Sequence, residues 1–300
     1  MVAHKTGFGI RTEIGDGNIM RVAVNVLPSP SELGEALAHH VADRLTARTS
    51  DRFLIGWPAG RTPEVLVEAL CALARDGLDL SAVVFVGMDE FLTGETGHWR
   101  NVDTNVHYSC RGWTQHRVIE PLRAAASPGR GPSGDAVWTP SPLDPEAYER
   151  RISDSGGVDF FVVASGSGDG HVALNSPPAD RNSRTRIVEL PDSTRRDNLA
   201  TFPQLKSLDQ APTHGVTVGL ATISDAHEIA LLLPGDGKRE AARRLFELDA
   251  FDPTWPASFV HNHPRATCWV DEHALGRSRS SFTAVPAADQ ASATILKEKS

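Results

Sequence analysis

Residues 158–178, "VDFFVVASGSGDGHVALNSPP", decide how the rest of the sequence is interpreted. The first part of the stretch is apolar and β-branched and then meets alternating glycines, which is typical of an interior strand of a parallel sheet. In such sheets the ligand crevice lies beyond the carboxyl ends of the strands. We therefore expect Asp169 and His171, which follow the glycines, to stand where chemistry takes place.

The rest of the chain alternates strand-like and helical segments, which predicts an α/β fold with an open, mostly parallel Rossmann-like sheet and helices on both faces. Ser29, Thr62 and Asp144 each precede a proline and are predicted to cap helices. Further strands are expected at residues 21–27, 52–57, 81–91, 214–220, 228–235 and 265–272.

Composition and segment boundaries favour a single elaborated domain. The 300 residues are 40% hydrophobic and 23% charged, which is enough apolar content for one large core. We expect an N-terminal extension at residues 1–20, one domain at 21–276 and a polar C-terminal tail at 277–300.

The charge and cysteine content exclude several classes of protein. A formal net charge of −8 without a basic stripe argues against a nucleic-acid partner. Cys71, Cys110 and Cys268 lie far apart and form no C-x-x-C pair, which is typical of reduced thiols. Without a signal-peptide core or a run of about 18 apolar residues, we expect a cytoplasmic protein with no membrane partner.

The glycines of "GSGDGH" invite two other interpretations. Their spacing differs from the dinucleotide-binding fingerprint, and no Walker A loop is present, so no nucleotide cofactor is expected. Alternatively, the glycines only form a tight turn and Asp169 caps a helix. These residues alone leave that alternative open.

Six motifs occur in a fixed order along residues 22–275, most of them at predicted strand ends: "PAGRTP", "GMDEF", "GSGDGHVALNSP", "SRTRI", "PGDGK" and "HPRATCWVDE". Together they resemble the glucosamine-6-phosphate deaminase/isomerase family, which is related to the 6-phosphogluconolactonases. The resemblance implies an enzyme that opens and isomerises a phosphorylated amino sugar without an organic cofactor. It leaves the assembly open, with a homo-oligomer as one option.

The resemblance also implies catalytic roles. Asp89 matches the carboxylate that moves a proton between C2 and C1 of the opened sugar, a task that needs a base in a partly dry site. His171 matches the histidine that opens the pyranose ring, and Asp169 would orient it. Glu90 alternates away from Asp89 on the strand and is expected to be a helix-side or interface carboxylate.

Substrate and phosphate contacts follow from the same resemblance. The turn at Gly60, Arg61 and Thr62 would hold the phosphate through backbone amides, and Lys238 would add a charge. The motifs assign two further substrate-binding residues, Gly168 and Arg186.

Two positions depart from the family pattern. Ser176 stands where the deaminases carry a glutamate that charges and orients the histidine, and Ala200 stands where their lid carries an arginine to the phosphate. We expect Ser176 to belong to the catalytic set in a retuned form. Arg61 would supply the missing guanidinium; alternatively, its side chain blocks the pocket or points to solvent. The departures leave two alternatives open: a hydrolase of the 6-phosphogluconolactonase type, and a non-catalytic homologue that binds a sugar phosphate.

The histidines of "HNH" (His261, Asn262 and His263) alternate along the chain, as ligands on one face of a strand would. The resembling family has a histidine and a proline here and no metal. We therefore expect no metal site, and we assign Trp57, Trp99 and Trp113 to core packing rather than to the cleft.

Overall fold

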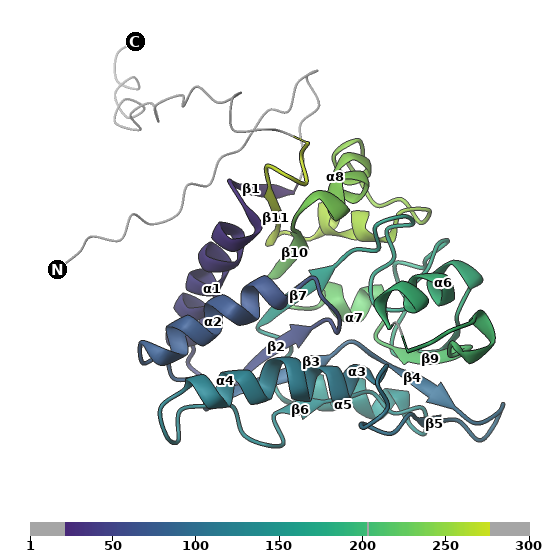
Figure 1. The fold of residues 1–300 in the computed structure, drawn as a ribbon, viewed down its shortest axis with the longest axis horizontal. Helices are drawn as coiled ribbons and strands as arrows, with labels where there is room; N and C mark the ends of the chain where they lie inside the picture. Colours follow the sequence, from purple (N-terminus) through teal and green to yellow (C-terminus); the bar gives the residue numbers. More distant parts are fainter. Residues whose placement is uncertain (1–21, 203, 277–300) are drawn as a thin grey trace, which may run out of the picture.

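The computed structural model describes residues 22–202 and 204–276, and Figure 1 shows them arranged around a central sheet. The sheet has seven parallel strands in the order β1-β11-β10-β7-β2-β3-β6. The strands are β1 (Ala23–Leu27), β2 (Phe53–Trp57), β3 (Val83–Gly87), β6 (Val137–Trp138), β7 (Phe160–Ala164), β10 (Ile229–Leu233) and β11 (Ala266–Asp271). The predicted fold class is confirmed.

Helices cover both faces of this sheet because alternate side chains of each strand point to opposite sides. Phe160 and Val162 of β7 belong to one core, and Phe161 and Val163 to the other. The first core packs beneath α1 (Pro30–Thr46), α2 (Glu64–Arg75) and α4 (Glu120–Ala125); the second packs beneath α5 (Pro145–Asp154), α7 (Leu220–Ser224) and α8 (Arg239–Phe246).

A second, antiparallel sheet lies beside the first, with strand order β5-β4-β9-β8. Its strands are β4 (Asp89–Thr93), β5 (Arg100–Asn101), β8 (Arg186–Glu189) and β9 (His214–Thr217). The single strand expected at 81–91 is therefore wrong, because the chain leaves the parallel sheet at Gly87 and enters the antiparallel sheet at Asp89. The strand expected at 214–220 also ends earlier and belongs to the second sheet.

Two of the three predicted helix caps are confirmed. The Ser29 side chain accepts a hydrogen bond from the Glu32 backbone N–H, and Asp144 accepts one from Ala147. The cap at Thr62 is wrong, since α2 begins at Glu64 with Pro63 in the N-cap position. Between β2 and that helix, the Glu64 N–H donates to the Arg61 carbonyl, so the loop turns once more before the helix starts.

The strand order reverses between β2 and β7. From β2 the sheet continues through β3 to β6, whereas from β7 it continues through β10 and β11 to β1. A crevice at the carboxyl ends is expected where neighbouring connections run to opposite sides. Two further elements stand over this edge: α3 (Cys110–Thr114), continued by a π-helical turn at Gln115–Ile119, and α6 (Asp192–Thr201).

The opposite, amino edge of the sheet is held by a buried carboxylate. Glu228, just before β10, accepts hydrogen bonds from His40 Nε2 at 2.5 Å, Arg44 Nε at 2.7 Å and an Arg265 nitrogen at 3.0 Å. Burial opposes ionisation of Glu228, but the bonds and charges of His40 and Arg44 lower its pKa to about 2. The carboxylate therefore ties α1 to the start of β10 and β11.

Glu228→Gln is expected to lower the free energy of unfolding at pH 7 by about 2 kcal/mol. The fall of the pKa from 4.5 to about 2 corresponds to about 3 kcal/mol. Since Arg44 and Arg265 are about half exposed, solvent screening reduces that figure. Because the folded pKa is depressed, the contribution is complete above pH 4.5 and disappears as the pH falls through about 2. Urea unfolding of the native chain and the variant measures the loss of stability at pH 7 and its decrease at pH 3.

Glu240→Gln is the matched control, because Glu240 forms an ion pair with Arg243 on the exposed face of α8. It is expected to change stability far less than Glu228→Gln. Equal effects of the two variants would show that the buried cluster does not stabilise the sheet edge.

Candidate active site

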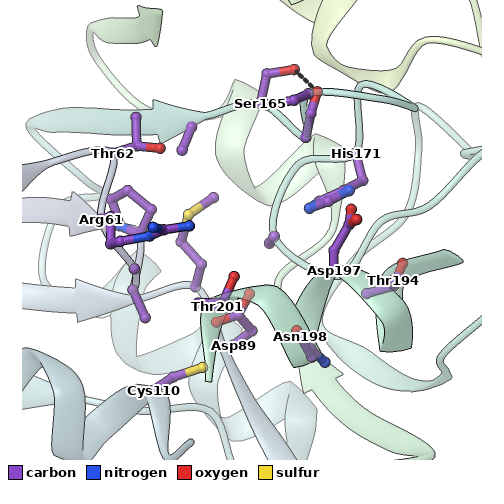
Figure 2. A pocket seen from close by; sticks show the side chains of 18 of the residues that line it. Arg61, Thr62, Asp89, Cys110, Ser165, His171, Thr194, Asp197, Asn198 and Thr201 are labelled. Atoms are coloured by element: carbon purple, nitrogen blue, oxygen red, sulfur yellow. Dashed lines mark hydrogen bonds between the residues drawn. The ribbon is translucent and has the colours of Figure 1, made fainter. Parts of the chain in front are cut away.

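A cavity of about 670 Å³, here the main cavity, opens at the carboxyl edge of the parallel sheet. It brings together the loops after β2, β3, β7 and β10, which are far apart in the sequence. Figure 2 shows Arg61 and Thr62 on one side, His171 and Asp197 on the other, and Asp89 near Cys110 below them. The predicted site residues that line the main cavity are Gly60, Arg61, Thr62, Asp89, Gly168, His171 and Lys238.

His171 is oriented by the acid that precedes it. Its Nδ1 lies 2.7 Å from Asp169 Oδ1, which also accepts the His171 backbone N–H at 3.1 Å. Burial opposes ionisation of Asp169, but the His171 hydrogen bonds and charge hold its pKa below the usual value. With Nδ1 bound to the carboxylate, Nε2 is the ring nitrogen free to exchange a proton with a ligand. Asp169 caps no helix, so that part of the alternative is wrong.

The three alternating glycines, at positions 166, 168 and 170, differ in what a side chain there would meet. A Cβ on Gly166 would lie 2.2 Å from His171 Nδ1 and 2.6 Å from Asp169 Oδ1, so the imidazole packs directly on the glycine backbone. Gly170 has φ +69°, and a Cβ there would lie 2.5 Å from the Trp255 ring. A Cβ on Gly168 would meet nothing within 4 Å. Two of the glycines thus shape the turn that presents His171.

Asp89 stands where the chain passes from one sheet to the other. Burial raises its pKa to about 6; the Cys110 thiol, which donates a hydrogen bond to it, opposes this rise. The neighbouring Glu90 adds to the rise and His171 opposes it. Near neutral pH the carboxylate is therefore ionised but unusually basic, as proton abstraction from carbon requires.

Glu90 points away from the cavity and organises a helix. It is 1% exposed and accepts hydrogen bonds from Ser109 Oγ and from the backbone N–H groups of Cys110 and Arg111. These donors lie at the start of α3, so Glu90 neutralises a helix N-terminus. The structure agrees with the predicted helix-side role.

Lys238 and Arg61 give the main cavity its positive charge. Lys238 Nζ donates to the Ser165 carbonyl at 2.6 Å, which leaves two of its N–H groups for a ligand. Burial lowers the pKa of Lys238 to about 8; Asp197 opposes the fall and Arg61 adds to it. The Arg61 side chain is exposed and points into the main cavity (Figure 2).

Three predicted site residues do not line the main cavity. Asp169 lies behind His171 and contacts it. Ser176 Oγ lies 3.1 Å from Thr194 Oγ1, so its hydroxyl forms a hydrogen bond with α6 and not with His171. Arg186 lies on β8, where it donates to the Arg184 carbonyl at 3.2 Å and burial lowers its pKa. Ser176 and Arg186, both predicted as site residues, therefore lie outside the lining of the main cavity.

Sequence analysis missed the wall that α6 contributes. This helix and its end provide five lining residues: Thr194, Asp197, Asn198, Thr201 and Phe202. The segment is polar and has little helical amphipathicity, so only the resemblance, which places Ala200 in the lid of the family, pointed to it. Ala200 lies on this helix, but its side chain is outside the described part of the chain.

The remaining predictions concern metal, thiols and membrane. His261 Nε2 lies 3.1 Å from the Leu245 carbonyl and His263 Nε2 lies 3.0 Å from that of Ala226, and no three potential metal ligands gather within residues 22–202 and 204–276. All three cysteines are buried and carry free thiols, without a disulfide between them. Among the described helices, none combines the length and the apolarity that a membrane span needs. The predicted terminal extensions, residues 1–20 and 277–300, lie outside the described residues.

Comparison with known sequences finds one matching family. Residues 28–269 match the model of the family described as "Glucosamine-6-phosphate isomerases/6-phosphogluconolactonase". A protein named glucosamine-6-phosphate deaminase from Streptomyces coelicolor is 33% identical over 255 residues, which cover 85% of this chain and 92% of the relative.

Solved structures give the same result. A monomeric glucosamine-6-phosphate deaminase superposes with a TM-score of 0.70 at 26% identity and covers 84% of this chain and 98% of its own. A 6-phosphogluconolactonase from Leishmania guyanensis gives a TM-score of 0.58 at 18% identity, covering 84% of this chain and 96% of its own, and is similar in fold.

Proposed function

Since the chain belongs to the family of glucosamine-6-phosphate isomerases and 6-phosphogluconolactonases, we propose that it converts an amino-sugar phosphate such as glucosamine 6-phosphate to a ketose phosphate and ammonia. The observation that carries the proposal is the shared cavity of Asp89 and His171. One offers a carboxylate of raised basicity and the other an oriented imidazole.

Ring opening is the first step. His171 Nε2 takes the proton of the O1 hydroxyl as the bond from C1 to the ring oxygen breaks, and then gives a proton to that oxygen. The product is the open-chain aldehyde. Asp169 holds the imidazole in place and stabilises the imidazolium that forms between the two transfers.

Isomerisation and deamination follow. Asp89 removes the proton on C2 and returns it to C1. The oxygen on C1 gains a proton and the nitrogen on C2 gives one up, so that the aldehyde becomes an alcohol while the amine on C2 becomes an imine. Water adds to the imine, and ammonia leaves as the C2 ketone forms. Lys238 and Arg61 hold the phosphate while these protons move.

The test is to measure ammonia and fructose 6-phosphate formed from glucosamine 6-phosphate, alongside hydrolysis of 6-phosphogluconolactone. Ammonia release supports the proposal. Lactone hydrolysis without ammonia release favours the hydrolase alternative, for which the neutral side chain at Ser176 is the relevant observation. Binding of the sugar phosphate without either reaction favours a non-catalytic homologue.

Arg61→Ala is expected to weaken sugar-phosphate binding on the order of tenfold or more, because a charge-assisted contact to a phosphate is worth about 1.5–3 kcal/mol. Calorimetric titration with the sugar phosphate measures the change. Arg75→Ala, at the far end of α2, is the control and should bind like the native chain. Unchanged affinity in Arg61→Ala would mean that its guanidinium does not touch the phosphate.

A further inference from the structure

A second cavity of about 610 Å³ lies next to the main cavity, and the mechanism above does not use it. It is enclosed by the start of α2, the loop before α3, the π-helical turn that follows α3 and the end of α6. Its lining residues are Arg61, Glu64, Thr104, Asn105, Val106, His107, Gly112, Trp113, His116, Arg117, Thr201, Phe202 and Gln204. The expectation that Trp113 only packs in a core is therefore too narrow.

The lining of the second cavity is basic in a chain of net charge −8. Arg61 and Arg117 line it together with one carboxylate from the described part of the chain, Glu64. His107 and His116 add groups that become cationic when protonated, and Glu120 lies 3.1 Å from His116 Nδ1. A concave surface with excess positive charge concentrates anions.

Arg117 is held in a position from which it can bind a ligand. Its guanidinium carbon lies 5.4 Å from the centre of the Trp113 ring, and the Trp113 ring lies 6.2 Å from that of Phe202. This cation–π contact with the indole face uses none of the guanidinium N–H groups. Among the residues that the structure describes, Arg117 has no ion pair, so its donors are available to an anion.

The two cavities share one wall, made of Arg61, Thr201 and Phe202. Among the residues that the structure describes, Arg61 is therefore the only cation that lines both cavities. A guanidinium offers five N–H donors and can bind an anion on either side of the wall. An occupant of the second cavity would thus act on the group that we assign to the substrate phosphate.

We propose that the second cavity binds a phosphate group, carried by a small molecule, between Arg117 and Arg61. Its occupant draws the Arg61 guanidinium away from the main cavity and lowers the affinity there for a second phosphate. The phosphate comes from one of two sources: a separate effector, or the distal end of a substrate that spans both cavities. The binding claim does not depend on the proposed deamination, whereas the effect on substrate affinity rests on that function.

Inorganic phosphate is the probe, titrated calorimetrically into the full chain at low ionic strength. We expect two sites in the native protein. Arg117→Gln should weaken one of them on the order of tenfold or more, and Lys238→Gln should weaken the other. Arg123→Gln, on α4 and outside both cavities, is the matched control and should leave both unchanged.

A single phosphate site that is insensitive to Arg117→Gln would overturn the proposal. Equal losses of affinity in the Arg117 and Arg123 variants would also overturn it, because they would show that phosphate responds to general surface charge.

Titration with a hexose bisphosphate distinguishes the two sources of the phosphate. One-to-one binding that both Arg117→Gln and Lys238→Gln weaken identifies a substrate spanning the cavities. Simultaneous binding of phosphate and a hexose monophosphate to separate sites, each lowering the affinity of the other, identifies an effector. Since all these measurements are of binding, they remain decisive if no ammonia is released.

Discussion

Replacing Asp89 with asparagine is expected to reduce ammonia release from glucosamine 6-phosphate by about 10²–10⁴-fold, the usual contribution of a positioned general base. The substitution keeps the size of the side chain but removes the group that takes the proton from C2. Ring opening depends on His171 and phosphate binding on Lys238 and Arg61. The variant should therefore still bind the sugar phosphate. Initial rates and calorimetric affinities at matched folded concentration measure the two effects separately.

The pH profile gives the same prediction a second readout. Asp89 must be ionised to act, so native activity should rise as the pH increases through about 6. The residual activity of Asp89→Asn should lack this rise. Asp225→Asn, which removes an exposed ion pair with Arg184, is the control and should retain the native profile. A variant lacking Asp89 that keeps more than a tenth of the native rate would rule out the carboxylate as the base.

The parallel sheet was predictable from sequence because its pattern is local. Buried strands such as β7 and β10 are continuous apolar runs, and a glycine or proline lies within two residues of the end of each and marks a turn of the chain. The chemistry follows the same rule, since the residues after strands β3, β7 and β10 must share one edge. Asp89, His171 and Lys238 were therefore expected together, and they line one cavity.

The second sheet and the α6 wall depend on contacts that the local pattern does not carry. Residues 83–93 form one strand-like run that is interrupted only by Asp89 and Glu90 before its last polar residue, Thr93, so the sequence does not show that pairing changes there from parallel to antiparallel. Ser176 illustrates the same limit. Its place in the motif suggested a partner for His171, yet its hydroxyl contacts Thr194, a residue 18 positions later on a different element.

Gly166→Ala is expected to reduce activity by about 100-fold or more, although residue 166 supplies no reacting group. A methyl group at this position would overlap His171 Nδ1 and Cε1, which lie 2.2 Å and 2.5 Å from the ideal Cβ. The imidazole must shift, and a displacement of about 1 Å at a catalytic group costs about 100-fold in rate. Ammonia release and the imidazole NMR signals of His171 report the rate and the hydrogen bond to Asp169.

Gly168→Ala is the matched control within the same turn, since a Cβ there meets no atom within 4 Å and the backbone is not left-handed. The added methyl group should leave the His171 signals unchanged, even if it alters substrate affinity from its place on the cavity wall. Comparing the two variants distinguishes two roles of glycine in "GSGDGH". Gly166 leaves room for the His171 imidazole, whereas Gly168 leaves space free at the wall of the main cavity. If Gly166→Ala kept both the native rate and the native His171 signals, the close packing of glycine and imidazole would not be what holds the histidine in its catalytic position.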